Sequence, residues 1–134
     1  MGFVVCNNGE GDALKAIVGH TAGENLVLRL FKTNVTPAET DTTATYTEAD
    51  FDGYAGVTLT GASWTVNEGA PSDASYAEQD FTAGAGIAAL QNVYGAYMTR
   101  VTSGRLFAAK DFSAARPVEN TGDNIGVTPT ITLD

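Results

Sequence analysis

Nucleophilic catalysis in this chain would have to use its single histidine, His20, or its single cysteine, Cys6. A histidine serves as the base in such chemistry when a third group orients it beside a serine, threonine or cysteine. No such motif surrounds His20, so we expect a surface histidine. Cys6 follows Val4 and Val5, which indicates a buried thiol, and one cysteine forms no internal disulfide. The sequence predicts no catalytic residue of this class.

The best candidate for metal binding is the run from Asp50 to Gly53, which resembles the opening of a calcium loop. An EF-hand loop needs its glycine at the sixth position and a glutamate at the twelfth. Here Gly53 is fourth and no glutamate ends the loop, so we expect a capped turn. One cysteine and one histidine make a zinc site improbable. The pair Gly84 and Gly86 completes neither nucleotide-binding fingerprint, so we expect no metal and no cofactor.

Carbohydrate chemistry leaves two alternatives open. Two carboxylates that hydrolyse a glycoside can come from distant strands, so a small jelly-roll hydrolase remains an alternative to the predicted absence of enzymatic activity. Aromatic side chains can stack on a sugar, and the candidates are Trp64, Tyr94, Tyr97 and Phe107. Aromatic residues at strand spacing are more typical of a core, so we expect Trp64 and Tyr97 to be buried.

The formal net charge of −9 resides entirely in the middle of the chain. Residues 33–99 contain no lysine or arginine. They contain nine acidic residues, Glu39, Asp41, Glu48, Asp50, Asp52, Glu68, Asp73, Glu78 and Asp80. Nucleic-acid backbones are bound by basic side chains, so a nucleic-acid partner is not expected. No run approaches the roughly 20 apolar residues of a membrane span, and Met1-Gly2-Phe3 lacks the features of a signal peptide.

A chain of 134 residues fits a single domain, 1–134, since domains of about 100–150 residues are the commonest. Near its start, Asp12 can cap a short helix. In that helix Leu14, Ile17 and Val18 share one face, and Gly19 ends it. A helix this short is unstable alone, so we expect its apolar face to lie against the rest of the domain.

The remaining pattern is that of short strands separated by turns. Strands are expected at residues 25–32, 57–60, 63–66, 75–82, 93–101, 105–110 and 125–133. Residues 93–101 are apolar on both sides of the period-2 pattern, which is typical of a central strand covered on both faces. Residues 33–46 predict an irregular excursion, and residues 47–54 one helical turn. Pro129 indicates an edge or a bulge in the last strand.

These elements show no βαβ rhythm, so the sequence predicts a mainly β fold. The expected architecture is a jelly-roll or β-sandwich with one short N-terminal helix, and a small barrel is the related alternative.

Several segments, in this order, resemble small capsid decoration (cement) proteins of tailed phages, which are of jelly-roll type. The resemblance is carried by residues 9–18, 25–37, 46–55, 93–99 and 125–133. They resemble the opening helix of that group, its first long strand, an aromatic-anchored turn and its last strands. One position departs from the pattern, because Ala108 stands after Leu106 and Phe107 where a tryptophan is expected.

The resemblance implies a phage virion structural protein that binds the outside of the major capsid shell and stabilises it. It implies a homotrimer on the capsid surface, assembled in the host cytoplasm, with the major capsid protein as partner. The contacts expected with the shell are the early helix and Gly2, Phe3, Val4, Val5 and Cys6. The trimer contacts expected are Tyr94, Tyr97, Ile131 and Leu133. The alternative is a carbohydrate- or receptor-binding β module of a tail or host-surface protein.

Overall fold

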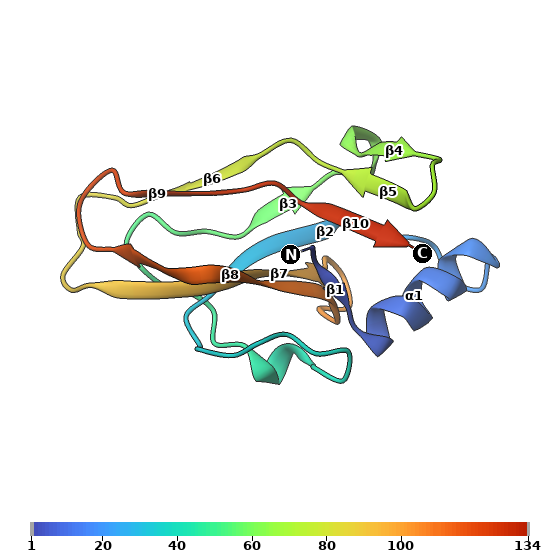
Figure 1. Ribbon diagram of the computed structural model, residues 1–134, viewed down its shortest axis with the longest axis horizontal. Helices are drawn as coiled ribbons and strands as arrows, with labels where there is room; N and C mark the ends of the chain where they lie inside the picture. Colours follow the sequence, from blue (N-terminus) through green and yellow to red (C-terminus); the bar gives the residue numbers. More distant parts are fainter. Residues whose placement is uncertain (1, 134) are drawn as a thin grey trace.

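The computed structural model describes residues 2–133, and its largest element is a five-stranded antiparallel sheet (Figure 1). Its strands, in spatial order, are β1 (Val4–Val5), β8 (Leu106–Val118), β7 (Gln91–Arg100), β2 (Leu26–Phe31) and β3 (Val57–Leu59). The strand predicted as central, at residues 93–101, is β7, the middle strand. A hairpin connects β7 to β8, the strand expected at residues 105–110.

Two smaller antiparallel sheets form the facing layer (Figure 1). One has the order β10 (Thr130–Leu133), β5 (Ser72–Ser75), β4 (Thr65–Asn67), and the other pairs β6 (Gln79–Thr82) with β9 (Asn124–Val127). One α-helix, α1 (Asn7–Ile17), and two single turns of 3-10 helix, η1 (Thr43–Thr45) and η2 (Gly61–Ser63), complete the fold. The predicted mainly β sandwich with one N-terminal helix is confirmed. Within residues 2–133, no helix is long and apolar enough to cross a bilayer.

The main hydrophobic core lies between these layers. The five-stranded sheet contributes Leu28, Leu30 and Met98, and the facing layer contributes Phe81 and Ile125. Every other residue of β2 from Leu26 to Leu30 faces this core, as its period-2 pattern predicts. Burial of these side chains is the main source of stability in a domain of this kind.

A second, smaller cluster covers the opposite face of the five-stranded sheet. The irregular segment 33–46 crosses this face (Figure 1) and brings Tyr46 onto it. The Tyr46 ring lies 4.7 Å from that of Phe31 and stacks 5.3 Å from that of Tyr97. The prediction that Tyr97 is buried is confirmed. This chain covers both faces of β7 by itself.

Three local predictions were wrong. Residues 47–54 form no helical turn; Glu48 bridges to Phe31 in extended conformation. Trp64 follows η2 instead of lying in a strand, and β4 begins at Thr65. Residues 75–82 divide into β5 and β6, which belong to different sheets because the chain crosses between them at residues 76–78.

The last strand is interrupted as Pro129 predicts. β9 ends at Val127 and β10 begins at Thr130, and the two strands pair with different neighbours. Pro129 is fully buried between them. It has no N–H to leave unpaired, which explains how the chain tolerates a proline at this break.

Candidate functional site

Helix α1 lies with its polar side toward the domain and its apolar side toward solvent. It begins at Asn7, five residues before the predicted cap, because the Sγ atom of Cys6 accepts a hydrogen bond from Gly9 N at 3.4 Å. The Asp12 side chain is 4% exposed. Leu14 and Ile17 are 64% and 82% exposed. The expectation that the apolar face packs inward was wrong, and this orientation reverses that of an ordinary surface helix.

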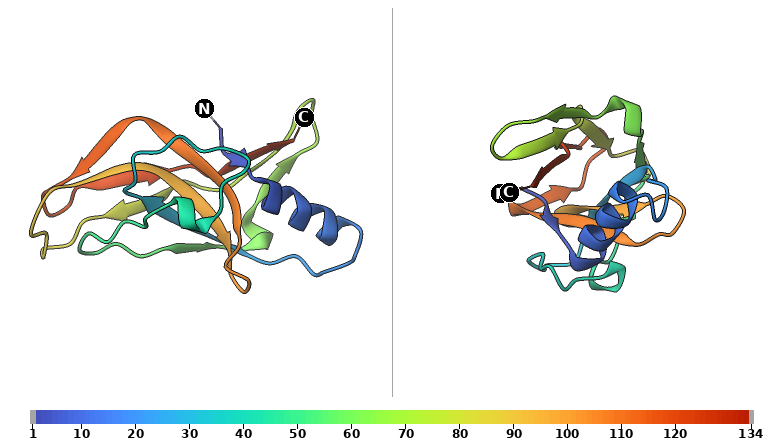
Figure 2. Two further views of the ribbon diagram at one scale, coloured as in Figure 1. Left: turned by 90° about the horizontal axis from the view of Figure 1, so that it is seen from below. Right: turned by 90° about the vertical axis from the view of Figure 1, so that its right-hand side faces the viewer.

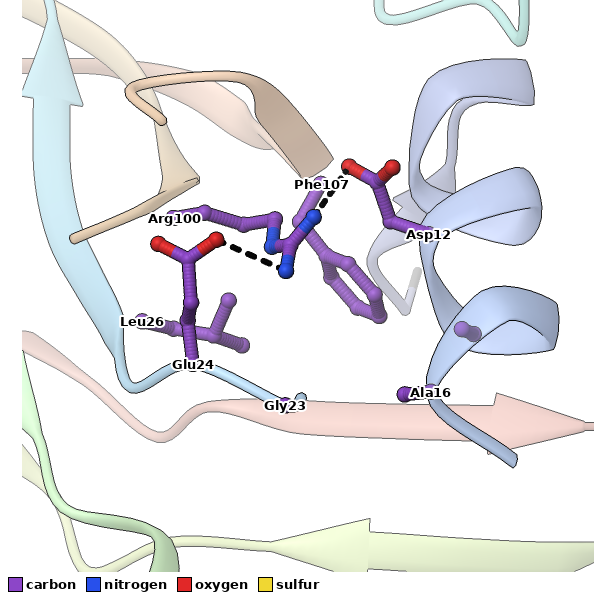
Figure 3. A pocket seen from close by; sticks show the side chains of 8 residues that line it. Asp12, Ala16, Gly23, Glu24, Leu26, Arg100 and Phe107 are labelled. Carbon is purple, nitrogen blue, oxygen red and sulfur yellow. Dashed lines mark ion pairs between the residues drawn. The ribbon is translucent and has the colours of Figure 1, made fainter. Parts of the chain in front are cut away.

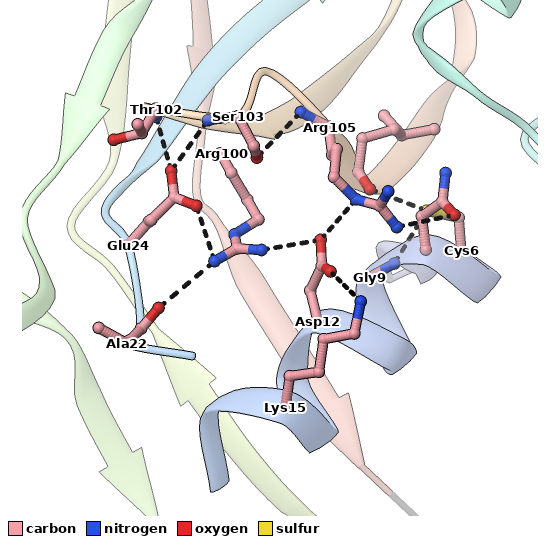
Figure 4. A network of polar contacts seen from close by, with 12 residues as sticks. Cys6, Gly9, Asp12, Lys15, Ala22, Glu24, Arg100, Thr102, Ser103 and Arg105 are labelled. Atoms are coloured by element: carbon pink, nitrogen blue, oxygen red, sulfur yellow. Dashed lines mark hydrogen bonds and ion pairs between the residues drawn. The ribbon is translucent and has the colours of Figure 1, made fainter. Parts of the chain in front are cut away.

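An ion cluster holds the polar side of α1 (Figure 4). Arg100 Nη1 lies 3.0 Å from Asp12 Oδ2, and Arg105 Nε lies 3.1 Å from the same oxygen. Lys15 Nζ, one turn along the helix, lies 3.8 Å from Asp12 Oδ1. Asp12 therefore neutralises positive charge from both sides of the turn that joins β7 to β8, and from Lys15 of α1 itself.

Glu24 extends the cluster to the tip of that hairpin (Figure 4). Its Oε2 lies 2.7 Å from Arg100 Nη2. Its Oε1 accepts hydrogen bonds from the backbone N–H groups of Thr102 and Ser103 at 2.6 and 3.1 Å. Arg100 is thus shared between two carboxylates. The arrangement ties α1, the segment before β2 and the hairpin tip together.

Both carboxyl groups have pKa values below their ordinary range. Burial raises the pKa of Asp12, but hydrogen bonds from Arg100 and Arg105 and their positive charges outweigh it. Burial likewise raises the pKa of Glu24, and the Thr102 and Ser103 amides with Arg100 outweigh it. A general acid at neutral pH needs a pKa shifted upward. The cluster is therefore suited to holding structure and does not resemble an acid–base pair.

A hollow of about 210 Å³ lies beneath α1, beside this cluster (Figure 3). Its lining residues are Asp12, Ala13, Ala16, Gly23, Glu24, Leu26, Arg100 and Phe107. Its three charged side chains already pair with one another. Within residues 2–133, every buried side-chain nitrogen or oxygen has a hydrogen-bond partner, so the hollow presents no unpaired buried polar atom to a ligand.

A larger hollow, of about 460 Å³, lies beside α1; we name it the helix groove. Its lining residues are Val5, Glu10, Ala13, Leu14, Ile17, Phe107 and Leu133. It brings together α1, β1, the start of β8 and the end of β10. Leu133 also lines an adjoining hollow that contains Val66, so the apolar surface continues onto the small sheet.

The five N-terminal residues expected to contact a shell differ in exposure, and Gly2 is exposed. Phe3 and Cys6 are buried, and Val4 and Val5 are half-buried in β1. Cys6 Sγ donates to Leu106 O at 3.1 Å, which confirms the predicted buried thiol. Val5 is the one of the five that lines the helix groove. Contact through Phe3 or Cys6 would require β1 to leave β8.

The four residues expected at a trimer contact are not brought together. Tyr97 lies under Tyr46 on one face of the five-stranded sheet. Tyr94 and Ile131 are half-buried in different clusters. Leu133 is exposed and lines the helix groove.

The candidates for catalysis and metal binding have structural roles or lie apart. His20 is exposed after the end of α1. Asp50 Oδ1 contacts Lys32 Nζ at 2.8 Å and Gln91 Nε2 at 2.6 Å, and Asp52 Oδ2 accepts from Gly86 N at 2.8 Å. Across residues 2–133, no three side chains of His, Cys, Asp or Glu gather as metal ligands would. The Asp50–Gly53 turn holds the loop before β7.

Trp64, one of the aromatic candidates for stacking on a sugar, was expected to be buried but is partly exposed. It packs edge-on against Tyr76, with ring centroids 5.3 Å apart and planes at 68°. The two rings share no flat face on which a sugar could stack.

The early helix and Val5 were expected to contact a shell, but the hollow that they form with Phe107 and Leu133 was not predicted. The apolar stripe of Leu14, Ile17 and Val18 was the signal, and it was assigned to the interior. The contact between Asp12 of the same helix and Arg100 determines which face of α1 is buried. Sequence spacing does not reveal that contact. No family model, characterised protein or solved structure gives a match to this chain.

Proposed function

We propose that this chain is a non-catalytic phage structural protein that binds the outside of the major capsid shell through the exposed side of α1 and the helix groove. The observation that carries the proposal is the orientation of α1. A helix that buries an aspartate and exposes leucine, isoleucine and valine leaves apolar area in water, at a cost of roughly 25 cal/mol per Å². A protein partner that covers this area recovers that free energy.

The exposed apolar side chains are concentrated at this end of the molecule. Within residues 2–133, seven large apolar side chains are exposed, and five of them lie on α1, directly after its end, or in the helix groove or the adjoining hollow. The five are Leu14, Ile17, Val18, Val66 and Leu133. Large contiguous apolar patches on a protein surface are typical of interaction sites.

The resemblance to decoration proteins supplies the identity of the partner in this proposal. The N-terminal helix and the last strand are two of the segments that carry the resemblance, and they meet at the helix groove. A homotrimer on the capsid surface, assembled in the host cytoplasm, belongs to the same proposal. Of its four expected contacts, Tyr97 is buried and Leu133 lies in the helix groove proposed for the shell, which leaves Tyr94 and Ile131.

A sedimentation experiment tests the proposal. Shells are assembled from the major capsid protein of the genome that encodes this chain, and the chain is added and sedimented with them. We expect the natural chain to sediment with the shells and the double variant Leu14→Gln, Ile17→Gln to remain in the supernatant. Leu90→Gln, which changes an exposed leucine outside this surface, is the control and should bind normally. A natural chain that ignores the shells, or a double variant that binds as well, contradicts the proposal.

A further inference from the structure

The strand β10 has an unpaired edge. It is the outer strand of the sheet β10-β5-β4. Tyr76 N donates to Pro129 O at 3.0 Å, so these two residues form a hydrogen-bonded pair. Such pairs alternate along an antiparallel ladder, which means that Ile131 directs its backbone groups toward β5. Thr130 and Thr132 direct their N–H and C=O groups away from β5, toward the open edge.

This open edge borders the helix groove. Leu133, the last residue of β10, lines the groove together with Val5 of β1. β1 is also an outer strand, and Cys6 N donates to Phe107 O at 3.1 Å, so the backbone groups of Val5 point away from β8 by the same alternation. Figure 1 and the left view of Figure 2 place α1, β1 and the C-terminal end of β10 at the same end of the molecule.

We propose that the helix groove accepts an extended segment of a partner protein, which adds to β10 as a further strand. The segment pairs with the outward backbone groups of Thr130 and Thr132. It places alternate apolar side chains into the groove, against Leu14, Ile17 and Leu133. In strand addition of this kind, main-chain hydrogen bonds supply affinity and the pockets for alternate side chains supply specificity. This inference rests on the proposed docking function and names the form of the partner.

The charge at the groove defines the segment further. Glu10 is the one charged residue among those that line it, and no cationic side chain within residues 2–133 forms an ion pair with it. A lysine or arginine at the position of the segment nearest Glu10 would form an ion pair with it. At the groove itself, where Glu10 is the one charged lining residue, the net charge of −9 favours a neutral or basic segment of another protein over a further copy of the chain as the occupant.

A displayed library of random segments of about twelve residues, enough to span the four residues of β10 with flanks, tests the inference. The library is selected against the immobilised chain, with the double variant Leu14→Gln, Ile17→Gln as the counter-target. We expect enriched segments in which apolar residues alternate with polar ones and one lysine or arginine is present. Enrichment of apolar residues at helical spacing, or no enrichment over the counter-target, overturns the inference.

A matched pair of variants at Thr132 tests the backbone contact. Thr132→Pro removes the outward N–H without removing a bond to β5, and a proline is tolerated on that side of an edge strand. Thr132→Val keeps the N–H and changes only the side chain. We expect Thr132→Pro to weaken binding of a selected peptide roughly fivefold, the effect of one main-chain hydrogen bond, and Thr132→Val to bind normally. Equal affinities for both variants overturn the strand addition.

Amide hydrogen exchange of the natural chain gives the same information without a substitution. A bound peptide should slow exchange of the Thr130 and Thr132 amides, and unchanged exchange at both positions overturns the inference. A second copy of the chain is the alternative occupant of the groove. In that case the library yields no peptide, and the double variant at Leu14 and Ile17 converts an oligomer to a monomer. That pair of results also overturns the inference.

Failure of this inference and failure of the proposed function are separable. If the natural chain and Thr132→Pro bind shells equally well, the capsid function stands and strand addition is wrong. If the chain selects alternating peptides through β10 but does not sediment with shells, strand addition stands and the capsid partner is wrong.

Discussion

Arg100 Nη1 lies 3.0 Å from Asp12 Oδ2, and this contact joins the last residue of β7 to the middle of α1. The Arg100 side chain is 11% exposed, and that of Asp12 is 4% exposed. The large apolar side chains of α1, Leu14 and Ile17, are mostly exposed, so this pair and its neighbours replace much of the apolar packing that usually holds an amphipathic helix. The stability and the orientation of α1 should therefore depend on charge.

Asp12→Asn should lower the free energy of unfolding by about 2–4 kcal/mol, because it leaves two arginines beside a neutral, largely buried group. Equilibrium unfolding in urea measures the change. Glu10→Gln, which removes an exposed carboxylate from the same helix, is the control and should stay within about 0.5 kcal/mol of the natural chain. A similar small effect at Asp12 would show that the ion cluster does not hold α1.

Stability should also fall in acid. The pKa values of Asp12 and Glu24 are lower in the folded chain than their ordinary values of 3.8 and 4.5. Groups shifted in this direction stabilise the fold above the unfolded pKa and lose that contribution as the pH falls through the folded pKa. We expect the thermal midpoint to decrease below about pH 4.5, and to decrease less in Asp12→Asn. Parallel curves for the two proteins would contradict this assignment.

Two glycines of α1 should respond to alanine in opposite directions. At Gly9, a Cβ atom would clash with the carbonyl oxygen of Phe107 and lie 3.0 Å from its carbonyl carbon, both backbone atoms of β8. At Gly11, nothing lies within 4 Å. Gly11→Ala should raise the free energy of unfolding by about 0.5–1 kcal/mol through helix propensity. Gly9→Ala should lower it by about 2 kcal/mol or more, since α1 must move away from β8. Urea unfolding that gives the same sign for both would show that α1 is not seated on β8 at Gly9.

The strands that sequence predicted well are those whose two faces differ clearly or are both covered. β2 alternates between the main core and the Tyr46 cluster, and β7 is apolar on both sides, so period-2 patterning located both within a few residues. The division of residues 75–82 could not be predicted in this way. Both halves are extended, so their pattern looks the same. They separate because β5 pairs with β10 and β6 pairs with β9, which are both far along the chain.

The candidate site could be predicted only in part, for a related reason. Spacing showed that Leu14, Ile17 and Val18 share a face of α1, but it does not show which face a helix buries. That depends on Arg100, which lies 88 positions beyond Asp12 and becomes its neighbour only through the sheet. Tyr46 is similar: segment 33–46 has no period, so its docking on β7 is decided by aromatic contacts between distant residues.

Three tyrosines should resist ionisation at alkaline pH. Burial raises the pKa of Tyr97 to about 12. Burial and nearby carboxylates also raise the pKa values of Tyr46, beside Asp41, and Tyr54, beside Glu48. Because these groups are neutral in the fold, their contribution to stability is complete below the unfolded pKa, near 10, and is lost as the pH rises above it. Tyrosinate absorbance should show delayed ionisation together with unfolding, and Tyr97→Phe should remove one of the delayed groups. Complete ionisation near pH 10 with the fold intact would contradict the burial of this cluster.

The apolar face of α1 should be nearly neutral for folding, although the proposed docking depends on it. Leu14 and Ile17 are mostly exposed, so Leu14→Gln and Ile17→Gln remove little buried area. Glutamine is also as good a helix former as either residue. Each substitution should change the free energy of unfolding by no more than about 0.5 kcal/mol. Leu28→Ala, at a fully buried position of β2, should cost about 2–5 kcal/mol. The double variant should also bind less of a dye that reports exposed apolar surface. A loss of more than about 2 kcal/mol at Leu14 or Ile17 would place these side chains in a core, and the groove would then be part of the fold and unable to serve as a docking surface.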